Sequence, residues 1–129
     1  MDKVVHFEIP AKDLERAKKF YSSVFGWQLE QMGPEMGNYV MARTAEVGED
    51  RMPRERGAIN GGIMLKMRPV KATALTINVE NIDEAVRKVK ANGGKLSRKK
   101  MKVGEMGMLA YVKDSEGNVT GLWQNLPKK

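Results

Sequence analysis

The sequence predicts an α+β fold of two βαβββ modules, because the chain repeats itself and each half shows the same order of periodic segments. Three short segments recur in the same order, residues 13–17, 35–37 and 57–61 matching residues 81–85, 105–107 and 117–121. Each match lies about half the chain from its partner, which indicates duplication of one supersecondary unit. At 129 residues the chain can bury one core. We therefore expect a single domain, 1–129, with module one at about residues 1–67 and module two at about residues 72–129.

The first half begins with an alternating β-rich run over residues 4–9, which predicts a strand that ends at Pro10. A helical stripe of apolar residues starts at Leu14, with Asp13 as the N-cap, and stops at Gly26. Further strands are expected at residues 27–32, 39–44 and 61–67. The charged, aperiodic stretch 45–57 predicts a long loop between the last two.

The second half follows the same plan after a linker at residues 68–71. An alternating run at residues 74–79 predicts a strand, and a stripe at residues 82–91 predicts a helix that ends in the Asn92–Gly94 turn. Strands are expected near residues 95–97, 108–113 and 119–124, with a tight turn at residues 114–118 between the last two.

Composition excludes several classes of site. The chain has no cysteine and one histidine, His6, so disulfides, thiolate sites and multi-histidine metal cages within one chain are excluded. The net charge is +7, but the densest basic cluster, residues 95–102, holds no aromatic residue for base stacking, and we expect no specific nucleic-acid binding. No apolar stretch approaches ~18 residues, so we expect no membrane partner. A cytoplasmic protein is the expectation.

Several of these residues match a known family. They are His6 in the first strand, residues 13–17, Phe20-Tyr21 with residues 24–27, and the closing residues 114–124. Together they resemble the vicinal-oxygen-chelate superfamily, which includes glyoxalase I, bleomycin-resistance proteins and extradiol dioxygenases. The resemblance implies the glyoxalase/bleomycin-resistance fold, in which two βαβββ modules form an incomplete mixed-sheet barrel around a concave cleft. It also implies a small-molecule ligand in that cleft and a homodimer.

The metal of this superfamily is where the sequence departs from the resemblance. In the metalloenzymes of the family, ligands lie on the first and last strands of each module. His6 matches the first of these positions, whereas Ala74, Gly61 and Gly121 at the other three offer no donor atom. A catalytic divalent metal needs about three protein ligands. We therefore predict no catalytic metal at the family position, and no cofactor.

Two groups of residues are candidates for the site. His6 and Glu8 lie two apart on one strand and so share a face, which makes them a candidate catalytic or anion-sensing pair. The alternative is that His6 is only a hydrogen-bonded polar residue. In the second group, glycines in strand interiors leave room for a ligand, and nearby aromatic rings can form a stacking wall. These ligand-binding candidates, whose alternative role is packing, are Gly61, Gly121, Tyr111 and Trp123.

Two classes of function stay open on these observations. In one, the protein binds or sequesters a small molecule without a metal, and the basic charge favours an anionic ligand. In the other it is an enzyme: either a lyase or isomerase with Glu8 or His6 as general base, or a metal-dependent glyoxalase whose ligands the pattern does not reveal. A third possibility is an interaction protein whose cleft is vestigial.

Overall fold

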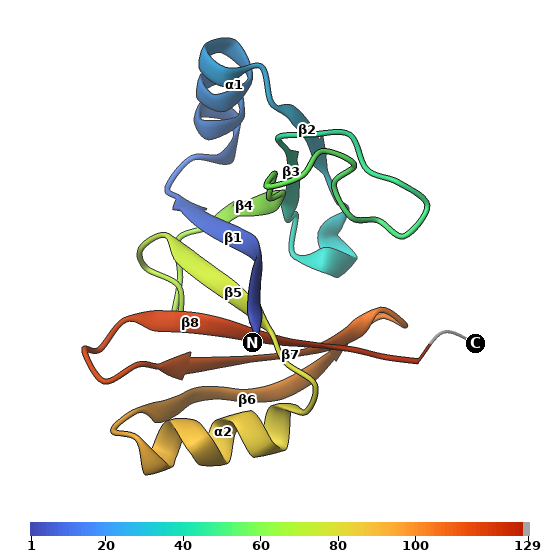
Figure 1. Ribbon diagram of the computed structural model, residues 1–129. Coiled ribbons are helices and arrows are strands. Elements are labelled where there is room, and N and C mark those ends of the chain that lie inside the picture. The colour runs from blue at the N-terminus through green and yellow to red at the C-terminus, as the bar shows by residue number, and fades with distance from the viewer. Residues whose placement is uncertain (128–129) are drawn as a thin grey trace. The chain divides into compact units, whose positions relative to one another are not determined.

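A computed structural model describes residues 1–127 and divides the chain into two compact units, shown in Figure 1. One unit comprises His6–Thr73, and the other comprises the chain from Ala74 onward together with Met1–Val5. Each half of the chain supplies one α-helix and four strands in the order βαβββ. The duplicated α+β unit that the repeat predicts is therefore confirmed. Neither α-helix of the described chain is long and apolar enough to cross a membrane.

The first module forms a mixed sheet in the order β2-β3-β4-β1. Strand β4 is parallel to β1 and antiparallel to β3, which is in turn antiparallel to β2. A short 3-10 helix, η1, precedes β3. The elements are β1 (Lys3–Ala11), α1 (Leu14–Phe25), β2 (Gln28–Gln31), η1 (Pro34–Met36), β3 (Val40–Arg43) and β4 (Gly61–Leu65).

Helix α1 begins and ends where the sequence predicts. The Asp13 carboxylate accepts a hydrogen bond from the Arg16 backbone N–H at 3.0 Å, and Gly26 ends the helix in the left-handed region at φ 72°. The helix covers one sheet face, where the buried core consists of Ala11, Val40, Ala42 and Ile63. Residues of β1 and α1 pack against that core, among them Phe7, Ile9, Leu14, Ala17 and Tyr21.

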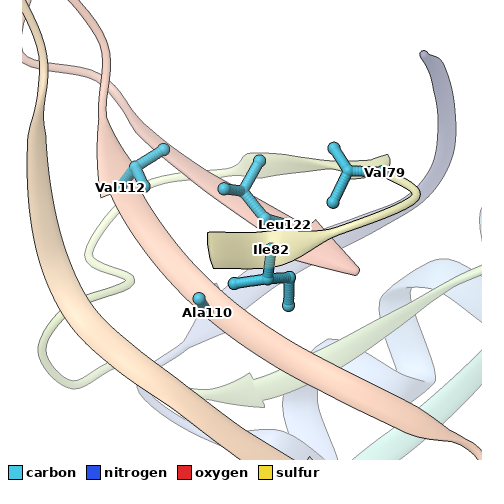
Figure 2. Close-up of a cluster of buried hydrophobic side chains, with 5 residues drawn as sticks. All are labelled: Val79, Ile82, Ala110, Val112 and Leu122. Carbon is cyan, nitrogen blue, oxygen red and sulfur yellow. The ribbon is translucent and has the colours of Figure 1, made fainter. Parts of the chain in front are cut away.

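The second module repeats this arrangement in the order β5-β8-β7-β6, with β8 parallel to β5. Its elements are β5 (Ala74–Asn78), α2 (Ile82–Ala91), β6 (Lys95–Val103), β7 (Gly107–Lys113) and β8 (Val119–Asn125). Figure 2 shows its buried cluster, in which Ile82, the first residue of the helix, lies with two alternate residues of β7 and one residue of β8. The cluster consists of Val79, Ile82, Ala110, Val112 and Leu122. The intervening residues of β7 and β8 therefore lie on the sheet face away from α2.

Strand β6 differs from its prediction. We expected residues 95–97, whereas the strand spans Lys95–Val103 and pairs antiparallel with β7. Two register shifts interrupt the pairing, one between Leu96 and Arg98 and one between Arg98 and Met101. The shifts break the two-residue period, and consecutive lysines hide what remains of it, so the sequence pattern stops too early. The basic cluster of the sequence is therefore an edge strand.

Candidate functional site

A hydrogen-bonded trio of polar side chains lies on the sheet face of the first module that α1 does not cover. The Tyr39 hydroxyl is 2.8 Å from Nε2 of His6 and donates a hydrogen bond to Oε2 of Glu8 at 3.1 Å. The rings of His6 and Tyr39 are stacked, with their planes 16° apart. Glu8 is only 5% exposed. A buried carboxylate needs such partners, because burying a charge without hydrogen bonds is costly.

The alternation of β1 places the two residues of this trio that the sequence predicts. Phe7 and Ile9 pack against the core beneath α1. Because successive side chains of a strand point to opposite faces, His6 and Glu8 take the other face. The structure brings them together there through Tyr39. Their catalytic role stays a prediction.

Sequence reasoning missed Tyr39, the residue that joins the pair. It follows η1 and a turn in which Gly37 and Asn38 both have positive φ, at 64° and 58°. Its backbone N–H donates a hydrogen bond to the Met36 carbonyl at 3.2 Å, which holds the backbone of Tyr39 in place. The signal available in the sequence was a tyrosine directly after a Gly-Asn turn and before a strand, which is too common to indicate a site.

The structure also corrects the position of Gly61. Its register partner is Phe7, and a β-carbon on Gly61 would collide with the Phe7 ring, so this residue lies on the core face with α1. Gly62 is the residue opposite Glu8, and a β-carbon there would overlap the Tyr39 hydroxyl. Gly61 was expected to leave room for a ligand, and the glycine that shares the face of His6 and Glu8 is instead Gly62. A shift of one position along a strand moves every side chain to the other face.

The other predicted ligand-binding residues share one face of the second module. Gly121 pairs with Tyr111 of β7 and with Thr76 of β5, and Trp123 follows two residues later on the same face. A β-carbon on Gly121 would lie 2.9 Å from the Thr76 hydroxyl oxygen, so glycine permits this close strand contact. The Trp123 indole donates to Oδ1 of Asn125 at 2.8 Å. The structure thus gathers these residues on one face, and their ligand contact stays a prediction.

Burial dominates the electrostatics of His6. Loss of solvent lowers the pKa of His6 to about 4, because burial disfavours the charged imidazolium. At neutral pH the ring is therefore uncharged and carries one proton. Such a ring can donate one hydrogen bond and accept another.

Comparison with known proteins identifies the family. The family described as "Bleomycin resistance protein-like N-terminal" matches residues 3–45. A glyoxylase-like domain-containing protein of Didymella fabae is 32% identical over 116 residues, which cover 86% of this chain and 84% of that protein. The chain belongs to the vicinal-oxygen-chelate superfamily as a glyoxalase-like member. A protein of Mycobacterium tuberculosis and Mycobacterium bovis with the printed name "Putative glyoxylase CFP32" is 30% identical over 120 residues. The match covers 91% of this glyoxalase-like chain but only 43% of the length of CFP32.

Solved structures of the superfamily confirm the fold. A glyoxalase/bleomycin resistance protein/dioxygenase superfamily member from Vibrio splendidus 12B01 has a TM-score of 0.63 at 14% identity, covering 98% of this chain and 100% of that one. Methylmalonyl-CoA epimerase from Mycobacterium tuberculosis has a TM-score of 0.62 at 17% identity, covering 96% and 88%. At these identities the likeness concerns architecture alone. The predicted glyoxalase/bleomycin-resistance fold is confirmed.

The residues present do not fit the divalent metal of the superfamily's metalloenzymes. Nε2 of His6 is hydrogen-bonded to Tyr39, and Gly62 across from Glu8 has no donor atom. In the second module the equivalent residues, Ala74 and Gly121, also lack donors. Within residues 1–127 no three His, Asp or Glu side chains gather as a metal cluster. The chemistry of this site therefore has to be derived from His6, Tyr39 and Glu8 themselves.

Proposed function

We propose that this glyoxalase-like protein binds a small molecule on the His6–Tyr39–Glu8 face, without a catalytic metal. The observation that carries the proposal is the hydrogen-bonded trio itself. A sheet face that only had to be covered would be filled with apolar side chains, whereas here an imidazole, a phenol and a carboxylate are held together and largely buried. Such a pre-formed polar cluster suits recognition of a polar ligand.

The lowered pKa of His6 supports binding rather than proton abstraction by the imidazole. A general base is most effective when its pKa lies near the working pH. With a pKa of about 4, His6 is uncharged at pH 7 but holds an added proton too weakly to be an effective base. It remains a good hydrogen-bonding group for a ligand.

Further features bear on the ligand and the assembly. The net charge of +7 favours an anionic molecule through long-range attraction. We also propose that Tyr111 and Trp123 form a ligand-contacting surface of the second module, with the missing side chain of Gly121 leaving space beside them. The homodimer and the cytoplasmic location stay predictions.

A lyase or isomerase with Glu8 as general base is the second candidate. The observation that favours it is the short contact between the Glu8 carboxylate and a hydroxyl that can move a proton, the Tyr39 phenol. One of the proteins with a similar fold is an epimerase, methylmalonyl-CoA epimerase. In this chain the reaction would run without a metal held by His6.

A ligand screen tests both candidates. Small carboxylates, phosphates and glycopeptides are added to the full-length protein, and thermal shift identifies those that stabilise it, with and without added Zn²⁺. We expect metal-independent stabilisation by at least one anion, reduced at least tenfold in affinity by Tyr39→Phe. Tyr21→Phe is the matched control, because Tyr21 stacks on Trp27 with ring centroids 4.8 Å apart, on the helix side of the sheet.

The outcomes separate the two functions. A stabilising molecule that stays unchanged in solution, followed by proton NMR over hours, supports binding. Conversion of that molecule, abolished by Glu8→Gln, supports the enzyme instead. Stabilisation only in the presence of Zn²⁺ contradicts both proposals, and so does the absence of any stabilising molecule.

A further inference from the structure

We propose that Tyr39 is a positioning residue that locks His6 in its Nε2–H tautomer, so that the ring presents the Nδ1 lone pair as the hydrogen-bond acceptor of the site. This inference deepens the proposed function, on which its consequence for the ligand rests. The lock itself is a property of the protein alone. The tautomer follows from counting the hydrogens available to the series of hydrogen bonds that links His6, Tyr39 and Glu8.

The proton count starts at the Tyr39 hydroxyl, which has one hydrogen to donate. That hydroxyl lies within hydrogen-bond distance of two groups, Oε2 of Glu8 at 3.1 Å and Nε2 of His6 at 2.8 Å. The Tyr39 hydroxyl is the donor in its hydrogen bond to Glu8, so the tyrosine hydrogen is directed to that carboxyl group. The contact with His6 is then a hydrogen bond only if Nε2 carries a hydrogen and donates it to the phenol oxygen.

The state of the second ring nitrogen follows from the charge of His6. A neutral imidazole has one N–H, and burial keeps His6 neutral at pH 7. With that hydrogen on Nε2, Nδ1 has a lone pair. The side-chain hydrogen bond recorded for His6 within residues 1–127 involves Nε2. Nδ1 is therefore the ring atom that can accept a hydrogen bond from a ligand.

Gly62 makes this arrangement possible. Any β-carbon at position 62 would overlap the hydroxyl and the ring of Tyr39, so a side chain at 62 and the tyrosine hydroxyl exclude each other. In this chain the phenol of Tyr39 takes that space and occupies Nε2 of His6.

The ligand class follows from the acceptor. A lone pair on Nδ1 pairs with an N–H or O–H group, and it gives no stabilisation to a bare anionic oxygen. The ligand that the site fits is thus a molecule with a hydrogen-bond donor positioned to reach His6. A hydroxy acid combines such a donor with the negative charge that the net charge of +7 favours.

The test uses the fact that His6 is the only histidine of the chain. Nitrogen-15 NMR of the full-length protein labelled in histidine gives one pair of ring resonances, and their shifts report which nitrogen carries the proton. At pH 7 we expect Nε2 protonated and Nδ1 unprotonated. Addition of equimolar Zn²⁺ should leave both resonances unchanged, because within residues 1–127 no three metal-ligating side chains gather to hold the ion beside His6.

Two variants make the test decisive. Tyr39→Phe removes the lock, and we expect both nitrogens to move toward the averaged shifts of exchanging tautomers. Glu8→Ala removes the acceptor, so the Tyr39 hydrogen turns to Nε2 and the tautomer inverts to Nδ1–H. Tyr21→Phe serves as the control and should leave the spectrum of His6 unchanged. Should Tyr39→Phe fail to fold, Glu8→Ala still gives a readout that a merely structural role for Tyr39 would not produce.

The proposal is overturned by an Nδ1–H tautomer in the wild-type protein, by wild-type shifts in either site variant, or by a Zn²⁺-dependent change in the wild type. None of these measurements needs a ligand. A correct tautomer together with an empty ligand screen therefore overturns the proposed function alone. A stabilising ligand together with the wrong tautomer overturns only the inference about Tyr39.

Discussion

The imidazole of His6 loses most of its water on folding and keeps one hydrogen bond in exchange, to Tyr39. This exchange makes the residue sensitive to acid. A histidine whose pKa is lowered in the folded state binds its proton more readily in the unfolded state, so protons favour unfolding. Among residues 1–127, the titratable groups recorded against the ring are Tyr39 and, through it, Glu8.

The first prediction concerns stability against pH. The folded pKa of His6 is about 4 and its ordinary value is 6.5, so the free energy of unfolding should be fully retained above pH 6.5 and fall as the pH drops toward 4. The loss should reach at most roughly 3 kcal/mol. Urea unfolding of the wild type and of His6→Gln at pH 7, 5.5 and 4.5 measures it. Equal losses in the two proteins would show that His6 is not the group responsible.

The second prediction concerns Gly62. Gly62→Ala should destabilise the protein by about 1–3 kcal/mol, because the new methyl group displaces the Tyr39 ring. In a Tyr39→Ala background the same substitution should cost far less, since the obstructing hydroxyl is gone. Chemical denaturation of the four proteins in this cycle gives the coupling. Additive effects of the two substitutions would contradict the steric exclusion.

At the scale of the element, local signals predicted the helices well and the edge strand poorly. Helix α2 spans Ile82–Ala91 as expected, because its N-cap residue Asn81 and its apolar stripe lie next to each other in the sequence. The alternation of β1 likewise predicted the shared face of His6 and Glu8. Strand β6 was underestimated because its register shifts and lysines mask the period.

Tyr39, the site residue that the sequence did not predict, was also missed because no local pattern indicates its contacts. Tyr39 meets Glu8 and His6 across 31 and 33 residues of sequence. That meeting depends on β1 pairing with β4 in one particular register, with Gly62 opposite Glu8. No local pattern sets this register, so the alignment of the repeat selected Gly61 instead.

The third prediction tests whether the two modules use equivalent helix caps. Asp13 and Asn81 each accept a hydrogen bond at 3.0 Å from the backbone N–H three residues later. Asp13→Ala and Asn81→Ala should each cost about 1 kcal/mol of unfolding free energy. Thermal denaturation of the single and double variants measures this, with Lys12→Ala as the control. A cap whose removal costs nothing would mean that its helix start is held by packing alone.

At the scale of the whole molecule, the duplication preserves the framework and changes the polar residues on it. In the first module Glu8 of β1 faces Gly62 of β4. In the second, Thr76 of β5 faces Gly121 of β8 in the same parallel register. The equivalent position thus holds a carboxyl group in one module and a hydroxyl group in the other. The duplicated fold alone could not reveal this difference, which gives each module its own chemistry.

The fourth prediction concerns assembly. The resemblance to the superfamily predicts a homodimer, so the protein should have about twice its 14.5 kDa chain mass in solution. Light scattering coupled to size exclusion, at several protein concentrations and at low and high salt, measures it. A mass of one chain throughout would contradict the prediction.

Among the described strands, the lysine-bearing strand β6 pairs with β7 alone and forms an edge of its sheet. Its repelling ammonium groups and its two register shifts make it a poor template for the β-strands of other molecules. The positive charges of β6 therefore oppose the edge-to-edge pairing of strands from different molecules, which is the step by which fibrils grow. A chain stripped of the β6 lysines would keep its sheet but lose much of its protection from aggregation.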